Sequence, residues 1–393
     1  MTWRDASKGF DSRWSPAPND RRENLHLLHF VAFCCNCLTA AAHDLRIGAM
    51  PEDTLANSEN APYAGLTPDA VLNALESAGL RPDGRLQALN SYENRVYQFG
   101  IEDDKPLVAK FYRPGRWSDA QILEEHAFVI ELAGRELPVI APLVLANKST
   151  LHESGGYRIA VYPRCGGRAP ELEDPHTLEW MGRFLGRIHA VGALKPFVER
   201  PALDVETFGD EPRDYLLDHD FIPGDLVEAW TSVVDNALEA AERCYERAGD
   251  VATLRLHGDC HSGNVLWIED RGGKSVPGLT DSGPHFVDFD DARTGPAIQD
   301  LWMLLSGERE AMRVQFGHVL RGYEDFAEFD DRERHLVEAL RTLRLIHYSA
   351  WIGRRWDDPA FPAAFPWFNT ARYWQDRILE LREQIALMDE APL

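Results

Sequence analysis

Basic residues are in short supply in this chain. Its 393 residues include 41 lysines and arginines against 64 aspartates and glutamates, which gives a formal net charge of −23 at pH 7. Nucleic-acid backbones and anionic membrane surfaces select basic protein faces, so we expect neither as a partner. The charge does not exclude a small anionic ligand, because a few local lysines or arginines can still bind a nucleotide.

Cysteine is also scarce, and its spacing follows no familiar framework. The six cysteines are Cys34, Cys35, Cys37, Cys165, Cys244 and Cys260. Three of them crowd into four positions and the others are scattered, which matches neither a disulfide framework nor a paired CxxC zinc pattern. We therefore expect a protein of the reducing cytoplasm.

A long hydrophobic run stands at residues 25–42 (LHLLHFVAFCCNCLTAAA). It is slightly shorter than the roughly 20 apolar residues of a membrane-spanning helix, and it contains histidines and an asparagine. A signal peptide is the alternative, because small residues follow the run, but the run starts late, after a polar stretch with prolines. We expect residues 1–62 to be a poorly structured extension, with Met50 as a natural start of the cellular protein.

Two glycine-rich nucleotide motifs are missing. The sequence contains no G-x-G-x-x-G and no G-x-x-x-x-G-K-[ST], which excludes the protein-kinase glycine loop and the Walker loop. In their place, between two strand-like runs, stands LNSYENRVYQF at residues 89–99. The hydroxyl and amide groups of Asn90, Ser91 and Asn94 can contact phosphate, although an ordinary polar hairpin turn explains them equally well.

The remaining pattern predicts a globular protein with two lobes. Hydrophobic residues make up 44% of the chain and charged residues 27%, as in ordinary folded proteins. The predicted first lobe, residues 63–163, is rich in strands, and the predicted second lobe, residues 164–390, is mostly helical. We therefore expect an α+β protein with a small β-rich N-lobe, a larger helical C-lobe, and a hinge near residues 162–167.

Local signals place the elements of both lobes. In the first lobe we predict helices over residues 67–80 and 118–133, the second opened by a capping box of Ser118 and Gln121. The predicted strands of this lobe are residues 85–89, 95–101, 106–112, 142–147 and 157–163, with an acidic hairpin turn between the second and third. The predicted helices of the second lobe are residues 178–191, 224–248, 308–326, 331–354 and 370–388. Its predicted short strands are residues 253–257, 264–268 and 285–289.

The strongest chemical signal is LRLHGDCHSGNVLW at residues 254–267, followed by HFVDFDDA at residues 285–292. Asp259 and Asn264 lie five residues apart in a polar loop between strand-like runs, and such a loop can aim both side chains at one point. Asp288 ends another apolar run, so we expect its carboxylate at a strand end. Because Mg²⁺ prefers oxygen ligands, Asn264 and Asp288 are the predicted metal ligands. Asp259 is then left to accept a proton from an attacking hydroxyl.

The same HGDCH segment has two other interpretations. The spacing of His257, Asp259 and His261 permits the metal cluster of a hydrolase, which would hold a transition metal tightly. Alternatively, these polar side chains satisfy backbone groups in a turn. An upstream lysine in the right place favours phosphoryl transfer over both.

Such a lysine exists in the strand-like run LVAKFY. Strand alternation puts Val108, Lys110 and Tyr112 on one face, where an ammonium group among apolar neighbours needs an anionic partner such as phosphate or a carboxylate. The capped helix that follows carries Glu124 and Glu125. Glu125 lies on the apolar face of that helix, so it is the predicted partner of Lys110, with Glu124 as the alternative.

The order H-x-D-x-x-x-x-N followed by V-D resembles the catalytic and metal loops of the aminoglycoside phosphotransferase and choline kinase group. With LNSYENRVYQF, VAKFYRPGRWSDAQILEEH and DDARTGPAIQDLWMLL, the segments are similar to the bacterial stress response kinases, which are cytoplasmic serine/threonine protein kinases. The similarity covers roughly residues 65–390. It implies a two-lobed protein-kinase-like fold of the aminoglycoside phosphotransferase type, with ATP as co-substrate and Mg²⁺ as cofactor.

The resemblance also implies roles for single residues. Asp259 would accept the proton, and Asn264 and Asp288 would hold Mg²⁺, with Asp288 counted as catalytic as well. Ser91 would contact ATP. The aspartate that matches Asp300 braces the catalytic loop in this family pattern.

Several further segments carry weaker signals. We expect His189 in the core or hydrogen-bonded to the catalytic segment. The aromatic-rich residues 348–374 are expected to pack, with Arg354 and Arg355 as candidates to line a substrate cleft. The loop over residues 268–285 is longer than the short hairpin usual in the family. We expect it to bulge from a turn and leave its two ends in place, because loop length costs little.

The acceptor is not determined by these motifs. The leading hypothesis is a serine/threonine protein kinase of the stress response, acting on proteins, and it depends on the subfamily resemblance. A kinase for a small alcohol, such as an amino alcohol, sugar or antibiotic, is the rival. A non-catalytic nucleotide-binding regulator is a third possibility, which the intact set of lysine, aspartates and asparagine disfavours. Without a heptad seam, we expect a monomer.

Overall fold

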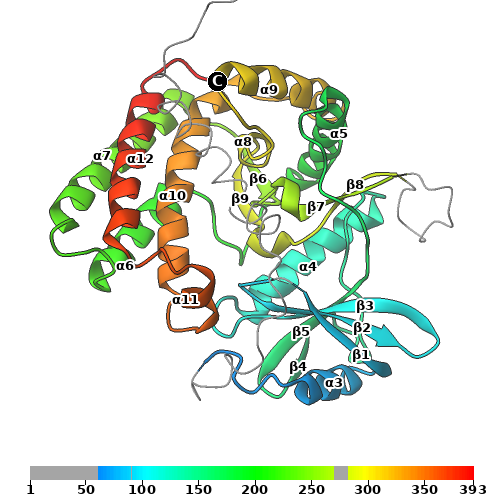
Figure 1. Ribbon diagram of the computed structural model, residues 1–393. Helices are drawn as coiled ribbons and strands as arrows, with labels where there is room; N and C mark the ends of the chain where they lie inside the picture. The colour runs from blue at the N-terminus through cyan, green and yellow to red at the C-terminus, as the bar shows by residue number, and fades with distance from the viewer. Residues whose placement is uncertain (1–60, 90, 270–281) are drawn as a thin grey trace, which may run out of the picture.

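The computed structural model describes residues 61–89, 91–269 and 282–393. The predicted extension therefore lies outside the described residues except for its last two positions, and so do Asn90 and most of the long loop. Figure 1 shows two lobes, a β-sheet lobe with two helices and a larger helical lobe. The predicted two-lobed α+β architecture is confirmed. Among the helices of the described part, none is long and apolar enough to cross a membrane.

The N-lobe is built around a five-stranded antiparallel sheet with the strand order β1-β2-β3-β5-β4. Its elements are α3 (Pro68–Ser77), β1 (Pro82–Leu89), β2 (Arg95–Ile101), β3 (Asp104–Phe111), α4 (Asp119–Gly134), β4 (His152–Ser154) and β5 (Tyr157–Pro163). Strands β2 and β3 form the predicted hairpin, whose turn residue Asp103 has a positive φ of 60°. Both N-lobe helices begin as predicted. The Thr67 side chain caps α3, and Ser118 and Gln121 form the capping box of α4.

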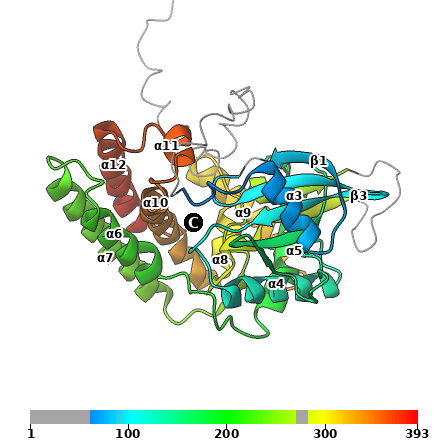
Figure 2. The ribbon, with the colours of Figure 1, turned by 90° about the horizontal axis from the view of Figure 1, so that it is seen from below.

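The two faces of the sheet pack against different partners. Ala109 and Phe111 point to the face that α3 covers, where they join Val71 and Leu75 in a buried cluster. Lys110 lies between them in sequence and therefore points to the opposite face, toward α4. Figure 2, seen from below, shows α3 on the outer face of the sheet.

The predicted strand over residues 142–147 is wrong. The Leu143 amide still donates to Val161 of β5 at 2.7 Å, but the Leu145 amide donates to Ser149 at 2.8 Å and closes a turn. Lys148 takes a left-handed backbone conformation in that turn, with φ of 62°. These residues therefore form a turn although their composition favours a strand. The short strand β4 forms the edge of the sheet instead.

The C-lobe combines long helices with two small antiparallel sheets, β6 with β9 and β7 with β8. Its helices are α5 (Pro175–Gly192), α6 (Glu211–Asp218), α7 (Val227–Ala248), α8 (Ile298–Trp302), α9 (Arg309–Tyr323), α10 (Val337–Gly353), α11 (Ala360–Ala364) and α12 (Ala371–Met388). Its strands are β6 (Thr253–Leu256), β7 (Val265–Ile268), β8 (Gly283–Phe286) and β9 (Arg293–Pro296). Short turns of other helix types are η2 (Glu206–Asp210), η3 (Ser262–Asn264), η4 (Phe289–Asp291) and η5 (Asp331–Leu336). The predicted helix over residues 331–354 is therefore divided, because its first turns form the 3-10 helix η5 and α10 begins at Val337.

The long loop leaves the flanking strands paired, as predicted. Ile268 pairs with Gly283, and the ladder continues to Val265 and Phe286. Helix α4 connects the lobes, because Phe128 on α4 packs edge-on against Phe289 of the C-lobe, with ring centroids 6.1 Å apart. In Figure 1, α4 lies between the N-lobe sheet and the small C-lobe strands.

Candidate active site

The loop that carries Asp259 begins at the end of β6, and a buried carboxylate supports it. Asp300, on α8 and fully buried, accepts hydrogen bonds from the backbone amides of His257 and Gly258, both at 2.9 Å. Gly258 has φ of +84°, and a Cβ atom there would collide with the main-chain oxygen of Asp291. The loop can therefore pass this point only with glycine, and Asp300 fixes the position of the residue that follows.

His189 extends this support into α5. Its Nε2 lies 3.1 Å from the Asp300 carboxylate and its Nδ1 lies 3.0 Å from the Tyr323 hydroxyl, and the ring is buried. The predicted bracing role of Asp300 and the predicted core position of His189 are both confirmed. Neither side chain lines the two cavities, described below, that contain Asp259 and Lys110.

Asp259 is the residue that this support positions. Its carboxylate is 2.7 Å from the guanidinium of Arg344 on α10 and 3.5 Å from His261 Nε2. Burial alone would raise the pKa of Asp259, but Arg344 and then His261 outweigh it and hold the pKa well below its ordinary value. Asp259 is therefore ionised at neutral pH.

Asn264 contacts Asp259, and Asp288 lines the same cavity as both. The Asn264 side-chain amide donates to the main-chain oxygen of Asp259 at 2.9 Å, so its nitrogen is in use and its oxygen is the atom left for a cation. Asp288 follows β8 in the left-handed region, with φ of 60° and ψ of 63°. That conformation is costly for a residue other than glycine and is typical of functional positions. The two side chains offer an amide oxygen and a carboxylate, a donor set that fits Mg²⁺.

Lys110 points into the same site from the N-lobe. Its ammonium is 2.6 Å from Asp288 and 3.8 Å from Asp290. Burial alone would lower the pKa of Lys110, but the two aspartates outweigh it and hold the pKa well above its ordinary value. The lysine therefore stays charged although it is almost completely buried.

The predicted ion pair between Lys110 and Glu125 does not form. Among the described residues, the carboxylates within 4.0 Å of the lysine are those of Asp288 and Asp290. Glu125 lines the same cavity as Lys110 and is buried, and that burial raises its pKa to about 7. The alternative partner is also wrong, because Glu124 accepts the backbone amides of residues 198–200 on another side of the helix.

The polar loop after β1 brings Ser91 to the site. Ser91 lines both cavities described below. Asn94 was predicted as a further phosphate contact, but its amide group holds the loop together. Its nitrogen donates to Asp290 at 3.2 Å, and its oxygen accepts the Arg113 amide at 3.1 Å. Asn90 lies outside the described residues.

Two cavities meet at Ser91, Asn264 and Asp288. The cavity between the lobes, about 350 Å³, contains Lys110 and Glu125. Its apolar lining consists mainly of Leu89, Val96, Val108, Val129, Ile140 and Leu266. The other, about 440 Å³, is on the C-lobe side, contains Asp259, and has walls formed by Tyr348, Trp351 and Phe365. We call them the inner cavity and the outer cavity. Asp259 therefore faces the outer cavity close to the point where the two join.

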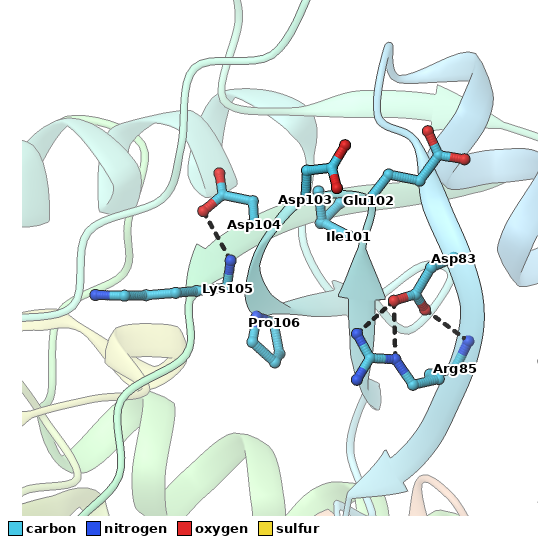
Figure 3. A pocket seen from close by; sticks show the side chains of 8 residues that line it. All are labelled: Asp83, Arg85, Ile101, Glu102, Asp103, Asp104, Lys105 and Pro106. Atoms are coloured by element: carbon cyan, nitrogen blue, oxygen red, sulfur yellow. Dashed lines mark hydrogen bonds and ion pairs between the residues drawn. The ribbon is translucent and has the colours of Figure 1, made fainter.

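A larger hollow of about 860 Å³ lies away from this chemistry, at the turn of the β2–β3 hairpin and the start of β1. Figure 3 shows that contacts among its lining residues are local, between Asp83 and Arg85 and between Asp104 and the Lys105 amide. It is wide open, and no predicted site residue lines it. We assign it no part in the chemistry.

The hydrolase interpretation of HGDCH has no support in the described residues, where no three His, Cys, Asp or Glu side chains are grouped to hold a metal ion. His257 is instead tied to the backbone, since its Nε2 lies 2.9 Å from the main-chain oxygen of Val287.

Sequence reasoning missed Arg344 and the aromatic wall of the outer cavity. Arg354 and Arg355 were the predicted cleft residues, but Arg355 pairs with Glu93 at 2.7 Å and Arg354 lies over the ring of Tyr215. Helical spacing could have identified these residues together. Arg344, Tyr348 and Trp351 are separated by four and three positions and therefore share a face of α10.

The fold and the site together indicate a two-lobed, kinase-like phosphotransferase. The site consists of a lysine on a strand, an aspartate and an asparagine in one loop, and a second aspartate at a strand end. The comparisons agree with this class. The chain belongs to the phosphotransferase enzyme family (APH), whose model matches residues 85–336. It is an ATP-dependent phosphotransferase.

Several named kinases are similar to this chain over most of its length. The chain is 45% identical over 331 residues to stress response kinase A of Salmonella choleraesuis (strain SC-B67), a match that covers 84% of this chain and 96% of the relative. It is equally similar to serine/threonine protein kinase RdoA of Salmonella typhimurium (strain LT2). Stress response kinase A of Escherichia coli (strain K12) is 43% identical over 337 residues, covering 86% and 98% of the two chains.

Solved structures resemble the fold at low sequence identity. Amicoumacin kinase hAmiN, in complex with AMP-PNP, Ca²⁺ and Ami, has a TM-score of 0.62 at 18% identity and covers 82% of this chain and 94% of its own. A microcompartment-associated aminopropanol kinase has a TM-score of 0.60 at 17% identity, with coverages of 81% and 96%. These similarities establish the fold alone.

Proposed function

We propose that this chain is an ATP- and Mg²⁺-dependent serine/threonine protein kinase that acts in a stress response. The observation that carries the proposal is the meeting of Asp259, Asn264 and Asp288 where the two cavities join. The names of the relatives, at 42–45% identity over nearly their whole length, favour a protein hydroxyl as acceptor. We further propose that the protein works as a monomer in the cytoplasm.

The inner cavity is the proposed nucleotide site. Its aliphatic lining suits an adenine ring, and Lys110 supplies a positive charge for the phosphates. Ser91 would contact the phosphates at the junction, and Glu125 would stabilise the lysine end of the cavity. Asn264 and Asp288 would hold Mg²⁺, which when bound neutralises charge on the phosphate oxygens.

Asp259 is the proposed general base. An acceptor hydroxyl in the outer cavity lies between this carboxylate and the junction. As the hydroxyl oxygen bonds to the γ-phosphorus and the bond to the β-phosphate oxygen breaks, its proton passes to Asp259. A carboxylate with a low pKa is suited to this step, because the proton leaves late in a loose transition state.

A small-molecule kinase is the second candidate. The outer cavity is concave, and its volume of about 440 Å³ is within the range that small ligands occupy. The fold itself serves many acceptors, so it does not decide between the candidates.

The test is to incubate the protein with Mg²⁺ and γ-labelled ATP, alone and with a generic basic protein acceptor. We expect label on serine or threonine, and we expect Asp259→Asn to lower the rate by about 100-fold or more. Asp325→Asn is the matched control, because Asp325 is an exposed aspartate paired with Arg183.

Each result has a definite meaning. Label on protein that Asp259→Asn removes and Asp325→Asn retains supports the proposal. Label that appears on pooled small metabolites and on no protein would move the assignment to the second candidate. ATP binding without any transfer would leave a nucleotide-binding regulator.

A further inference from the structure

The loop between Asp259 and Asn264 carries no permanently charged side chain of its own. Residues 260–263 are Cys-His-Ser-Gly, without lysine or arginine. Asp259 nevertheless has a full positive charge beside it, because the Arg344 guanidinium lies 2.7 Å from its Oδ1. The cation thus comes from α10, far along the chain, and only the fold brings it to the loop.

The pair stands in the wall of the outer cavity. The side chains of Arg344 and Asp259 are 23% and 19% exposed, so neither is sealed in the core. Tyr348 and Trp351, one and two turns further along α10, line the same cavity. Arg344 is therefore the member of this helix face that reaches the reacting carboxylate.

The two oxygens of Asp259 have different surroundings. Oδ1 faces Arg344, whereas Oδ2 lies 3.3 Å from the Asn264 amide nitrogen and 3.5 Å from His261. The ion pair to Oδ1 thus fixes the rotation of the carboxylate and turns Oδ2 toward the metal-ligand side, where the hydroxyl must arrive. The contact is an ion pair without hydrogen-bond geometry, so charge attraction at 2.7 Å, and not the direction of an N–H donor, holds Oδ1.

From this geometry we propose that Arg344 is a positioning residue for phosphoryl transfer, which holds the base through Oδ1 while Oδ2 accepts the proton. The proposal rests on the proposed function, since it assigns Asp259 the role of base. It does not concern ATP binding, because Arg344 does not line the inner cavity. Loss of Arg344 therefore affects turnover more than nucleotide affinity.

The experiment compares Arg344→Ala, Arg344→Lys and Arg341→Ala with the unchanged full chain. Arg341 is the matched control, because it lies one turn earlier on α10, pairs with Glu338, and does not line either site cavity. Transfer from γ-labelled ATP gives kcat and KM for ATP, and thermal unfolding checks the fold. We expect Arg344→Ala to lose about 100-fold in kcat with KM changed less than about threefold. Arg344→Lys should recover part of the loss.

Added guanidinium ion at low concentration supplies a second readout. It should raise the rate of Arg344→Ala, whose cavity has room for it, and leave Asp259→Asn and the unchanged chain unaffected. The proposal is overturned if Arg344→Ala keeps kcat within about threefold, or if it loses kcat only in step with KM or with stability. An unchanged chain without any transfer activity would overturn the proposed function as well, so the two failures are distinguishable.

Discussion

At the scale of single residues, the candidate site contains two groups that stay ionised at neutral pH and one group that titrates near it. Lys110 and Asp259 each have an opposite charge within 2.7 Å and remain ionised despite burial. Glu125 lines the inner cavity, and its burial outweighs the attraction of Lys110, so its pKa rises to about 7. The ionisation of this carboxylate therefore changes near physiological pH.

The first prediction concerns stability against pH. The pKa of Glu125 is about 7 in the folded state, against an ordinary value of 4.5, so the folded state binds the proton more tightly. Its contribution is fully present below about pH 4.5 and is lost as the pH rises through 7. At about pH 8.5 we expect Glu125→Gln to be more stable than the unchanged protein by up to about 3 kcal/mol, measured by urea unfolding.

Glu76→Gln serves as the control, because Glu76 is an exposed glutamate on α3. It should leave the difference in unfolding free energy between about pH 5.5 and about pH 8.5 unchanged. A Glu125→Gln protein with the same pH dependence as the unchanged chain would show that this carboxylate stays ionised in the folded state.

At the scale of elements, the short helix α8 supports the loop after β6 through the side chain of Asp300. Asp300 accepts two backbone amides of the catalytic loop and contacts His189 of α5. It therefore connects α5, α8 and the loop after β6. Helix α5 packs closely against α9, since a Cβ on Gly182 would collide with the main-chain oxygen of Val319. The loop is thus supported by closely packed helices.

The second prediction is that Asp300→Asn weakens this support. The substitution keeps the size but removes the charge and turns one acceptor into a donor that faces other donors. We expect a loss of about 1–3 kcal/mol in unfolding free energy and a fall in kcat, measured by urea unfolding and by the transfer assay.

The exposed pair of Asp325 with Arg183 provides the comparison, and Asp325→Asn should cost less than about 1 kcal/mol. If Asp300→Asn equals this control in both stability and kcat, the bracing role is refuted.

At the scale of the whole molecule, buried charges join the lobes. Asp358, which precedes α11 and is 3% exposed, lies 2.7 Å from Arg113 and 3.5 Å from Arg95 of the N-lobe. Glu93, in the loop that carries Ser91, pairs with Arg355 and accepts the Trp351 indole N–H, both at 2.7 Å. Figure 1 shows α11 at the end of the helical lobe that is next to the N-lobe. The loop that carries Ser91 and Glu93 is therefore held by contacts from the C-lobe.

The third prediction tests this connection with Asp358→Asn. Asp358→Asn removes the buried carboxylate that pairs with Arg95, whereas Arg113 keeps Glu93 at 3.1 Å, so we expect a cost of up to about 3 kcal/mol. We expect lower stability in urea unfolding and faster backbone hydrogen exchange in residues 91–95.

The neighbouring Asp357 is exposed, so Asp357→Asn is the matched control and should be nearly neutral. Equal stability and equal exchange in both variants would mean that Asp358 contributes nothing to holding the lobes together.

The sequence by itself determined the parts of this protein that depend on near neighbours. Caps at Thr67 and Ser118, the alternation that turns Lys110 inward, and the spacing of Asp259 and Asn264 are local properties, so the lobes and the catalytic segment could be predicted. The predicted strand at residues 142–147 failed for a local reason too, because a turn was overlooked.

Only the tertiary structure decided which charges meet. Lys110 pairs with Asp288 and not with Glu125, and Arg344 reaches Asp259 from a helix that carries no motif. A buried charge takes the nearest opposite charge that the packing of distant elements provides, and sequence spacing carries no information on that distance.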